Sequence, residues 1–286
     1  MTQRRFAVIG DPIAHSKSPV MHAAAYRALG LEHTYEAVRV SEAQLRGVVD
    51  QLRAGVFDGL NVTVPHKQRV LAMVHDIDES AAMVGAANTL VRSSDGRVTA
   101  HNTDAPALAH ELARLGASAR EGASALVIGS GGAARSAIVA LAVHLEFVRV
   151  VVRARAFRSG EVASAFRCEL NGRLLAVGCP CVVEAEALDP AAEPFNAVVQ
   201  CTSAGMPGAD GGDAVARAVA WDQLAPDAVA LDVVYAPTKT EFFRAAEGAS
   251  MPCVDGLGML VEQGALAFKL WLGVDAPRQA MRDAIL

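Results

Sequence analysis

Short apolar runs alternate with segments of helical periodicity along the first hundred residues. An apolar run bounded by turn residues predicts a buried strand, and apolar positions three or four apart predict a helix that packs on it. Ser18 and Pro19 suit the start of a helix, with Ser18 as the N-cap, and Ser41 with Gln44 forms a capping box for a second helix. The predicted elements are strands at 6–10, 35–40 and 60–64, a first helix to about residue 29, a hairpin over 88–102 and a helix over 105–115.

The same alternation continues through the second half of the chain. The predicted strands there are residues 125–128, 147–152, 174–177, 197–200 and 228–234, with helical segments in several of the gaps. Repetition of strand and helix is typical of an α/β fold with a parallel sheet. Two helical segments, 256–271 and one from about 276, follow a sheet that is already complete. We therefore expect the C-terminus to pack on the first domain.

Composition narrows the class of protein. At 286 residues the chain has room for one very large domain or two ordinary ones. Hydrophobic residues make up 52%, but no window approaches the roughly 20 apolar residues of a membrane span. The chain enters its first strand too early for a signal peptide, and an odd number of cysteines, five, favours reduced thiols. A net charge of −5 argues against a nucleic-acid surface and disfavours membrane adsorption. These features predict a cytoplasmic protein whose partner is a small molecule, with no nucleic acid and no membrane.

A metal site is not expected. Cys179 and Cys181 are spaced as C-x-C, without a histidine nearby, and this pattern favours two ordinary thiols over a metal or redox pair.

The strand predicted at 125–128 runs into a glycine-rich turn and a helix. Gly129 permits a sharp exit from the strand, Gly131 lets the backbone approach a pyrophosphate, and Ala134 lets the helix pack close to the strand. The N–H groups and the positive dipole end of the helix suit a phosphate. A tight turn with no ligand is the plainer alternative, but the strand–turn–helix context favours nucleotide binding.

Arginines follow the next predicted strand, at Arg153, Arg155 and Arg158. A free ribose 2′-hydroxyl, in NAD or in a methyl donor, usually meets a carboxylate here, and the sequence has none. Arginine suits a 2′-phosphate, so the pattern favours NADP, with Arg158 and one of Arg153 or Arg155 on the phosphate. The alternative is a run of arginines that face solvent.

Several polar residues of the first half are candidates for chemistry: Ser18, Lys67, Asn88 and Asp104. Each also has a plain structural explanation, as a helix cap, a turn residue or solvated surface. A lysine ammonium beside a carboxylate could instead protonate the alkoxide that forms when hydride adds to a ketone. Taken singly, these residues do not decide between structure and chemistry.

Taken together, the motifs are more specific. In chain order they are Gly10-Asp-Pro-Ile-Ala-His-Ser-Lys-Ser-Pro19, Asn61-Val-Thr-Val-Pro-His-Lys67, Gly85-Ala-Ala-Asn-Thr89, Asn102-Thr-Asp104, Gly129-Ser-Gly-Gly-Ala133 and Asp255-Gly-Leu-Gly-Met-Leu260. This set resembles the shikimate dehydrogenase family, over essentially the whole chain.

The resemblance implies a two-domain α/β fold. Residues 1–104 together with 255–286 would form a substrate-binding and catalytic domain, and residues 105–254 a Rossmann-type domain for NADP(H). The implied reaction is the reversible NADPH-dependent reduction of 3-dehydroshikimate to shikimate, the fourth step of the route to chorismate and the aromatic amino acids. The implied enzyme is a monomer or a homodimer.

The resemblance also implies roles for single residues. Lys67 and Asp104 would be the catalytic pair, and Ser16 and Ser18 would bind the substrate carboxylate. The ring hydroxyls would be held by Thr63, Asn88, Asp104 and Gln263, with Lys67 also at the substrate. The cofactor would be held by Gly129, Ser130, Gly131, Gly132, Ala133, Arg153, Arg155 and Arg158.

The chain departs from the family pattern at three places. Arg153-Ala154-Arg155 stands where Asn-Arg-Thr is usual, Ala105 where glycine is common, and His66 where phenylalanine or a similar residue is common. The first departure bears on how the 2′-phosphate is held. A quinate or quinate/shikimate dehydrogenase is one alternative, and a non-catalytic ligand sensor is another, which the retention of Lys67 and Asp104 disfavours.

Overall fold

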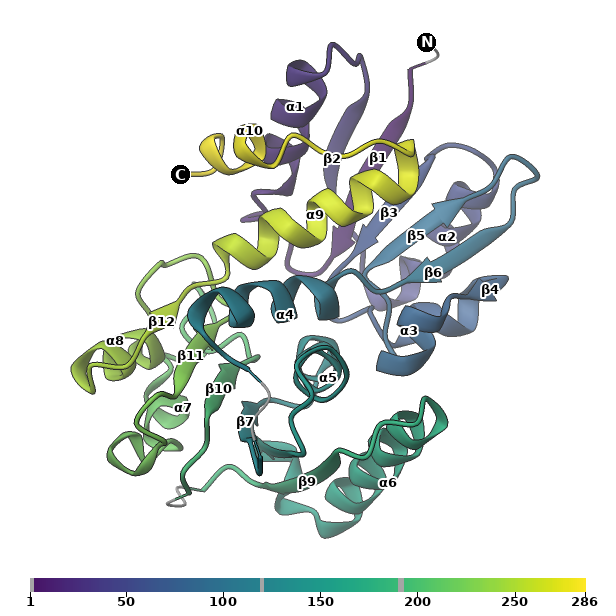
Figure 1. Ribbon diagram of the computed structural model, residues 1–286. Helices are drawn as coiled ribbons and strands as arrows, with labels where there is room; N and C mark the ends of the chain where they lie inside the picture. Colours follow the sequence, from purple (N-terminus) through teal and green to yellow (C-terminus); the bar gives the residue numbers. More distant parts are fainter. Residues whose placement is uncertain (1–2, 119–120, 190–192) are drawn as a thin grey trace. The chain divides into compact units, whose positions relative to one another are not determined.

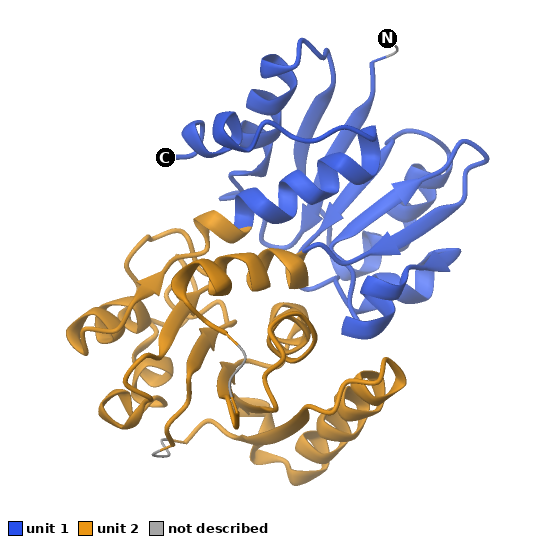
Figure 2. Cartoon of the chain, in the orientation of Figure 1, with its two compact units in different colours: residues 1–103, 260–286 blue, residues 104–259 orange. Residues whose placement is uncertain are grey.

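The computed structural model describes residues 3–118, 121–189 and 193–286, which form two compact units (Figures 1 and 2). Unit 1 comprises residues 1–103 and 260–286, and unit 2 comprises residues 104–259. The C-terminal segment thus belongs to the same unit as the N-terminal segment. Within the described residues, no helix is both long and apolar enough to cross a membrane.

Unit 1 is built on a six-stranded mixed sheet with the order β2-β1-β3-β5-β6-β4. The first three of these strands are parallel neighbours, and β3, β5 and β6 are successively antiparallel. The strands are β1 (Arg5–Gly10), β2 (Thr34–Arg39), β3 (Gly59–Val62), β4 (Asp76–Ile77), β5 (Thr89–Arg92) and β6 (Val98–His101). The helices are α1 (Ser18–Ala28), η1 (Glu42–Gln44), α2 (Leu45–Arg53), η2 (Arg69–Met73), α3 (Glu79–Val84) and α10 (Arg278–Asp283), with most of α9 (Leu257–Leu272).

Side chains alternate along β1 between two faces of this sheet, as the period of a strand requires. Ala7 and Ile9 pack with Val49 of α2 in one core cluster. Phe6 faces the other way and stacks on Trp271 of α9, with the ring centroids 4.8 Å apart. The sheet of unit 1 is therefore covered on both faces, by α2 and by α9 (Figure 1).

Unit 2 contains a six-stranded sheet with the order β12-β11-β10-β7-β8-β9, in which each neighbouring pair is parallel. Its strands are β7 (Ser124–Ile128), β8 (Arg149–Ala154), β9 (Val182–Ala187), β10 (Ala197–Gln200), β11 (Val229–Asp232) and β12 (Cys253–Val254). Its helices are α4 (Asp104–Leu115), α5 (Gly132–Val139), η3 (Ala140–His144), η4 (Arg155–Arg158), α6 (Gly160–Ala176), α7 (Asp213–Arg217), η5 (Trp221–Gln223) and α8 (Glu241–Gly248). This is the doubly wound Rossmann order, which reverses direction between β7 and β10. The predicted α/β class is confirmed.

The strand predicted at 174–177 is wrong. Residues 174–176 end helix α6, and the edge strand of the sheet is β9, which starts at Val182. Leu170 and Leu174 are four residues apart and both fully buried, so they form the inner face of a helix. Gly178, with a φ of 73°, follows the end of that helix.

Two of the local predictions near helix starts have different outcomes. The capping box of Ser41 and Gln44 is present and precedes α2. Ser18 is not an N-cap, because Lys17 occupies the cap position, and no side chain caps α1. The backbone of Lys17 is already helical and its carbonyl accepts from Met21 N over 3.1 Å. The helix therefore begins one residue earlier than the serine and proline suggest.

Candidate active site

The loops that follow β1 and β3 lie side by side at the carboxyl ends of these parallel strands. Gly10 ends β1, and a Cβ there would lie 2.5 Å from Thr63 Cγ2 and 2.9 Å from Val64 O. Asp11 N donates to Val64 O over 2.9 Å. The absence of a side chain at Gly10 therefore permits the close approach of the two loops. In open α/β sheets, ligands bind at this edge, where the strand order reverses.

Ser16 and Ser18 lie at the start of α1, on the loop that follows β1. Ser16 is half-buried, and its Oγ accepts from Ser18 N over 3.3 Å. Ser18 is 6% exposed. Lys17, between them, sends its Nζ to Ile285 O at 2.6 Å, so its charge is directed to the C-terminal segment. The two hydroxyls and the N–H groups of the first helical turn suit a carboxylate.

Lys67 lies on the loop that follows β3. Lys67 is half-buried. Its carbonyl accepts a hydrogen bond from Ala87 N over 2.8 Å, and Ala87 directly precedes Asn88 in the chain. His66, in contrast, is fully buried, with Nε2 at 2.6 Å from Val40 O. Two adjacent side chains of this loop therefore have different environments. His66 anchors the loop in the interior of unit 1, and Lys67 is only half-buried, beyond the carboxyl end of β3.

Asn88 makes several hydrogen bonds in this region. Its Nδ2 donates to Thr103 Oγ1 over 2.8 Å and to Gln263 Oε1 over 3.3 Å. Its Oδ1 accepts from Thr103 N over 2.7 Å, and its carbonyl accepts from Val62 N over 2.8 Å. Asn88 is only 2% exposed. Asn88 thereby brings together β3, through its backbone carbonyl, and the segment before α4 and helix α9, through its side-chain amide.

Asp104 follows this network directly in the chain, as the first residue of α4 and of unit 2. It is 3% exposed. Two preceding residues are fixed by unit 1: Thr103 by Asn88, and Asn102 by its Nδ2, which donates to Ala86 O over 2.9 Å. The unit 1 backbone is therefore fixed up to the residue that precedes Asp104.

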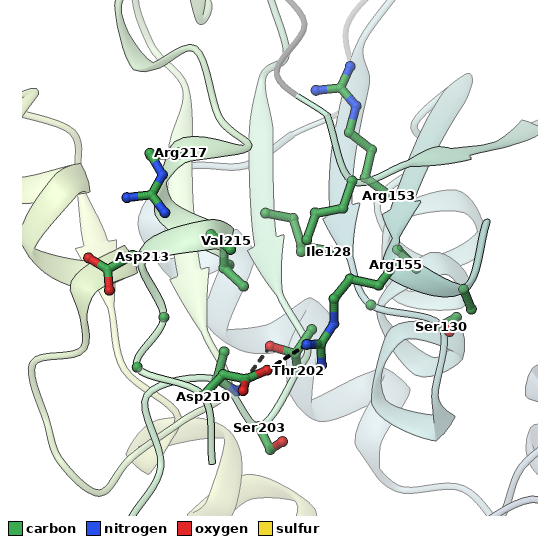
Figure 3. Close-up of a pocket in the computed structure, with 18 residues that line it drawn as sticks. Ile128, Ser130, Arg153, Arg155, Thr202, Ser203, Asp210, Asp213, Val215 and Arg217 are labelled. Atoms are coloured by element: carbon green, nitrogen blue, oxygen red, sulfur yellow. Dashed lines mark hydrogen bonds and ion pairs between the residues drawn. The ribbon is translucent and has the colours of Figure 1, made fainter. Parts of the chain in front are cut away.

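Unit 2 has a cavity of about 520 Å³ where its strand order reverses (Figure 3). Its walls come from the ends of β7 and β8, from the start of η4, from the segment that follows β10, and from α7 with the residues that lead into it. The lining residues are Ile128, Gly129, Ser130, Arg153, Ala154, Arg155, Ala156, Leu188, Thr202, Ser203, Ala204, Asp210, Gly211, Gly212, Asp213, Ala214, Val215 and Arg217.

The glycine turn on this cavity fits a dinucleotide. Gly129 has a φ of 120°, and a Cβ there would lie 3.2 Å from Thr202 Cγ2, so a side chain would be strained and crowded. Gly131 differs, since nothing lies within 4 Å of a Cβ built on it. The open space at Gly131 lies at the N-terminus of α5, where the first N–H groups have no partner inside the helix. A pyrophosphate can therefore approach this backbone closely.

The three candidate arginines occupy different environments. Arg153 is 1% exposed, and its guanidinium contacts Glu186 Oε2 at 3.3 Å and Glu193 Oε1 at 3.4 Å. Arg155 and Arg158 are both exposed, on η4, and of these two Arg155 lines the cavity whereas Arg158 does not. In Figure 3 the side chain of Arg155 extends across the cavity, and that of Arg153 extends the other way. The structure thus brings Arg155, but not the charge of Arg153, to the ligand side.

Residues that follow β10, such as Thr202 and Ser203, also line the cavity. They were not identified as candidates from the sequence. The available signal was the Rossmann order, which places the fourth strand beside the first. The side chain of Gln200, which is fully buried, holds their segment in place. Gln200 Oε1 accepts from Thr202 N, and its Nε2 donates to Asp232 Oδ1 over 3.2 Å.

Asp232, at the end of β11, is a buried carboxyl in this network. Its oxygens also accept from Val234 N over 2.9 Å and from the hydroxyl of Thr240. Burial raises the pKa of Asp232 to about 6, and the charge of Asp255 acts in the same direction. In the described part of the chain, no group of three or more histidine, cysteine or acidic side chains is arranged to hold a metal ion.

Comparison with known proteins gives consistent matches. Residues 8–90 match the model of the shikimate dehydrogenase substrate binding domain, and residues 256–286 match the shikimate 5′-dehydrogenase C-terminal domain. The chain is 34% identical to a shikimate dehydrogenase (NADP(+)) of Methanopyrus kandleri, covering 98% of this chain and 93% of that protein.

Two solved structures are similar over nearly their full length. Shikimate 5-dehydrogenase from Thermus thermophilus, in complex with NADP(H) and shikimate, has a TM-score of 0.81 and 33% identity, covering 99% of this chain and 98% of that one. Quinate dehydrogenase from Corynebacterium glutamicum, in complex with NAD, has a TM-score of 0.83 and 28% identity, with coverage of 99% and 98%.

Proposed function

The chain belongs to the shikimate dehydrogenase family, and from this premise we propose which of its residues perform the reaction. The activity is the reversible NADP-dependent interconversion of shikimate and 3-dehydroshikimate, an oxidoreduction at a CH–OH group in the biosynthesis of chorismate and the aromatic amino acids. We assign substrate binding to unit 1 together with Asp104, the first residue of unit 2, and cofactor binding to the rest of unit 2.

The observation that carries the substrate assignment is the network of Asn88. Its amide is fixed by Thr103 and reaches Gln263 at 3.3 Å, and its neighbour Ala87 pairs with the backbone of Lys67. A polyol ring needs several polar groups that are already held in place, because each ordered group lowers the entropy cost of binding. We assign the ring hydroxyls to Thr63, Asn88, Asp104 and Gln263, and the substrate carboxylate to Ser16 and Ser18.

Lys67 and Asp104 are the proposed catalytic pair. Bound NADPH supplies the hydride that reduces the ring ketone. As the carbonyl carbon gains its new C–H bond, the π electrons move to the oxygen, and that oxygen takes a proton from the Lys67 ammonium. The positive charge of Lys67 also stabilises the negative charge that develops on the oxygen. Solvent restores the proton to Lys67, and in the oxidation of shikimate the neutral amine accepts the proton instead. The carboxylate of Asp104 accepts a hydrogen bond from a ring hydroxyl and orients the substrate.

On the cofactor side, residues 129–133 would hold the pyrophosphate. The space beside Gly131 and the N-terminus of α5 support this assignment. For the 2′-phosphate we choose Arg155 over Arg153, because Arg155 is exposed on the cavity whereas Arg153 is buried against Glu186 and Glu193. Arg158, on the same short helix, is the second cation.

Quinate is the competing substrate, since a quinate dehydrogenase is among the similar structures. Initial rates with shikimate and with quinate, each with NADP and with NAD, test the assignment. The proposal predicts the highest kcat/KM for shikimate with NADP. A higher kcat/KM for quinate would identify a quinate dehydrogenase, and the absence of turnover with every pair would identify a ligand sensor.

We further propose a cytoplasmic enzyme that is a monomer or a homodimer. The five cysteines are all free thiols, which supports a reducing compartment. Light scattering during size-exclusion chromatography distinguishes one chain from two.

A further inference from the structure

Arg155 is engaged by a carboxylate from the opposite wall of the unit 2 cavity. Its Nη1 lies 2.6 Å from Asp210 Oδ2, and the two side chains point toward each other across the cavity in Figure 3. The residues are 55 positions apart in sequence, one after β8 and the other on the segment that follows β10. The contact therefore closes one side of the space that the cofactor would enter.

The backbone of Asp210 is held at this rim. Gly205 N donates to Asp210 O over 2.6 Å, and Ala209 N donates to Met206 O over 3.0 Å, so the segment folds back on itself. A Cβ built on Gly212 would lie 3.7 Å from Gly205 N, which shows how closely the two ends of the segment approach. The segment thus fixes the backbone of Asp210, and its carboxylate contacts Arg155 from that position.

We propose that Asp210 is a determinant of cofactor specificity, which opposes the binding of a 2′-phosphate by competing for the guanidinium of Arg155. This inference rests on the proposed role of Arg155 toward NADP. A phosphate that binds Arg155 must displace the carboxylate or share the guanidinium with it, and two anions within a few ångströms repel each other. A cofactor with a free 2′-hydroxyl leaves the pair intact. Asp210 therefore lowers the preference for NADP over NAD.

The size of the effect follows from exposure. The side chains of Arg155 and Asp210 are 75% and 66% exposed, and ion pairs at such positions contribute little, up to about 1 kcal/mol or roughly fivefold in affinity. A phosphate of charge near −2 can still displace the carboxylate. Removing the carboxylate should then tighten NADPH binding by about three- to fivefold and change NADH binding by less than about twofold.

Direct binding of NADPH and NADH to the full chain, measured by calorimetry or nucleotide fluorescence, tests the proposal. The variants are Asp210→Asn, Arg155→Ala and the combination of both, and Asp222→Asn is the control, an exposed acid of unit 2 that does not line the cavity. The proposal predicts that Asp210→Asn tightens NADPH binding, that Asp222→Asn does not, and that the gain vanishes in the Arg155→Ala background. High salt should also reduce the gain, because it screens exposed charges.

The outcomes separate the two claims. If Arg155→Ala weakens NADPH relative to NADH but Asp210→Asn changes neither, the role of Asp210 is refuted and that of Arg155 stands. If Arg155→Ala leaves the ratio of NADPH to NADH affinity unchanged, both are refuted. A gain from Asp210→Asn that persists without Arg155 would also refute the proposed competition, since it would show that the carboxylate acts on the phosphate by general repulsion.

Discussion

Asn88 and Thr103 hold each other through both ends of the asparagine amide. Asn88 Nδ2 donates to Thr103 Oγ1 over 2.8 Å, and Asn88 Oδ1 accepts from Thr103 N over 2.7 Å. Both residues are almost fully buried. The pair fixes the backbone immediately before Asp104 and at the same time orients a side chain that we assign to the substrate.

Replacement of Asn88 tests how much its hydrogen bonds to Thr103 contribute to the stability of the protein. Asn88→Ala leaves the buried Thr103 N without its acceptor, which costs about 1–3 kcal/mol of unfolding free energy. Gln263→Ala is the matched control, because the Gln263 side chain is half-buried and touches Asn88 only at 3.3 Å. Urea unfolding measures both variants. Equal losses would show that the Asn88–Thr103 pair has no special structural role.

The two serines at the start of α1 should affect binding more than stability. If each donates to the substrate carboxylate, Ser16→Ala or Ser18→Ala loses a charge-assisted hydrogen bond, and KM for shikimate rises about 10- to 100-fold. Stability should change little in Ser18→Ala, because Ser18 does not cap the helix. Ser41→Ala is the inverse control, since it removes a capping box and should cost about 1 kcal/mol without changing KM.

A substitution at Gly131 should affect cofactor binding without affecting folding. Nothing lies within 4 Å of a Cβ at Gly131, and its φ of −81° suits alanine, so Gly131→Ala should fold normally. The added methyl group would occupy the approach of the pyrophosphate and weaken NADPH binding by about tenfold or more. Gly172→Ala, at an equally open position in α6, is the control for stability and should not alter binding. Unchanged NADPH affinity in Gly131→Ala would argue against a pyrophosphate at this turn.

The buried carboxyl of Asp232 predicts a pH dependence of stability. Its pKa is raised from 3.8 to about 6, so the folded protein binds this proton more tightly than the unfolded chain does. The stabilisation from this group is complete below about pH 4 and is lost as the pH rises to about 6, by roughly 3 kcal/mol at 1.36 kcal/mol per pKa unit.

Asp232→Asn removes this titration, so the informative quantity is the difference in unfolding free energy between the two proteins. Relative to the variant, the unmodified protein should lose stability between pH 4 and pH 6. A difference that stays constant over that interval would show that Asp232 keeps an ordinary pKa.

The sequence predicted the fold class and the hairpin of β5 and β6 because both depend on local periodicity and turn residues. The strand at 174–177 was wrong because a short apolar run suits the inner face of a helix as well as a strand. Ser18 was misassigned as a cap because the helix start depends on the backbone of Lys17. In both wrong predictions, the local sequence fitted two structures about equally well, and the tertiary packing or the backbone geometry decided between them.

Some residues of the candidate site could also be predicted from the sequence, and others could not. The glycine turn at 129–133 could be located because its motif is contiguous. The choice between Arg153 and Arg155 could not, since it depends on Glu186 and Glu193, more than thirty residues away, which bury Arg153. Asp210 is a further case, because its contact with Arg155 exists only once β10 lies beside β7.

The kcat of Lys67→Ala tests the proposed chemistry most directly. If Lys67 protonates the developing alkoxide, kcat for shikimate oxidation and for the reverse reaction should fall by roughly 10²- to 10⁴-fold, while KM changes far less. Lys269→Ala is the control, since its ammonium pairs with Asp275 at 2.9 Å on the surface of unit 1, and it should retain normal turnover. A kcat for Lys67→Ala within about twofold of the unmodified enzyme would contradict the account, because a general acid contributes at least about 10²-fold.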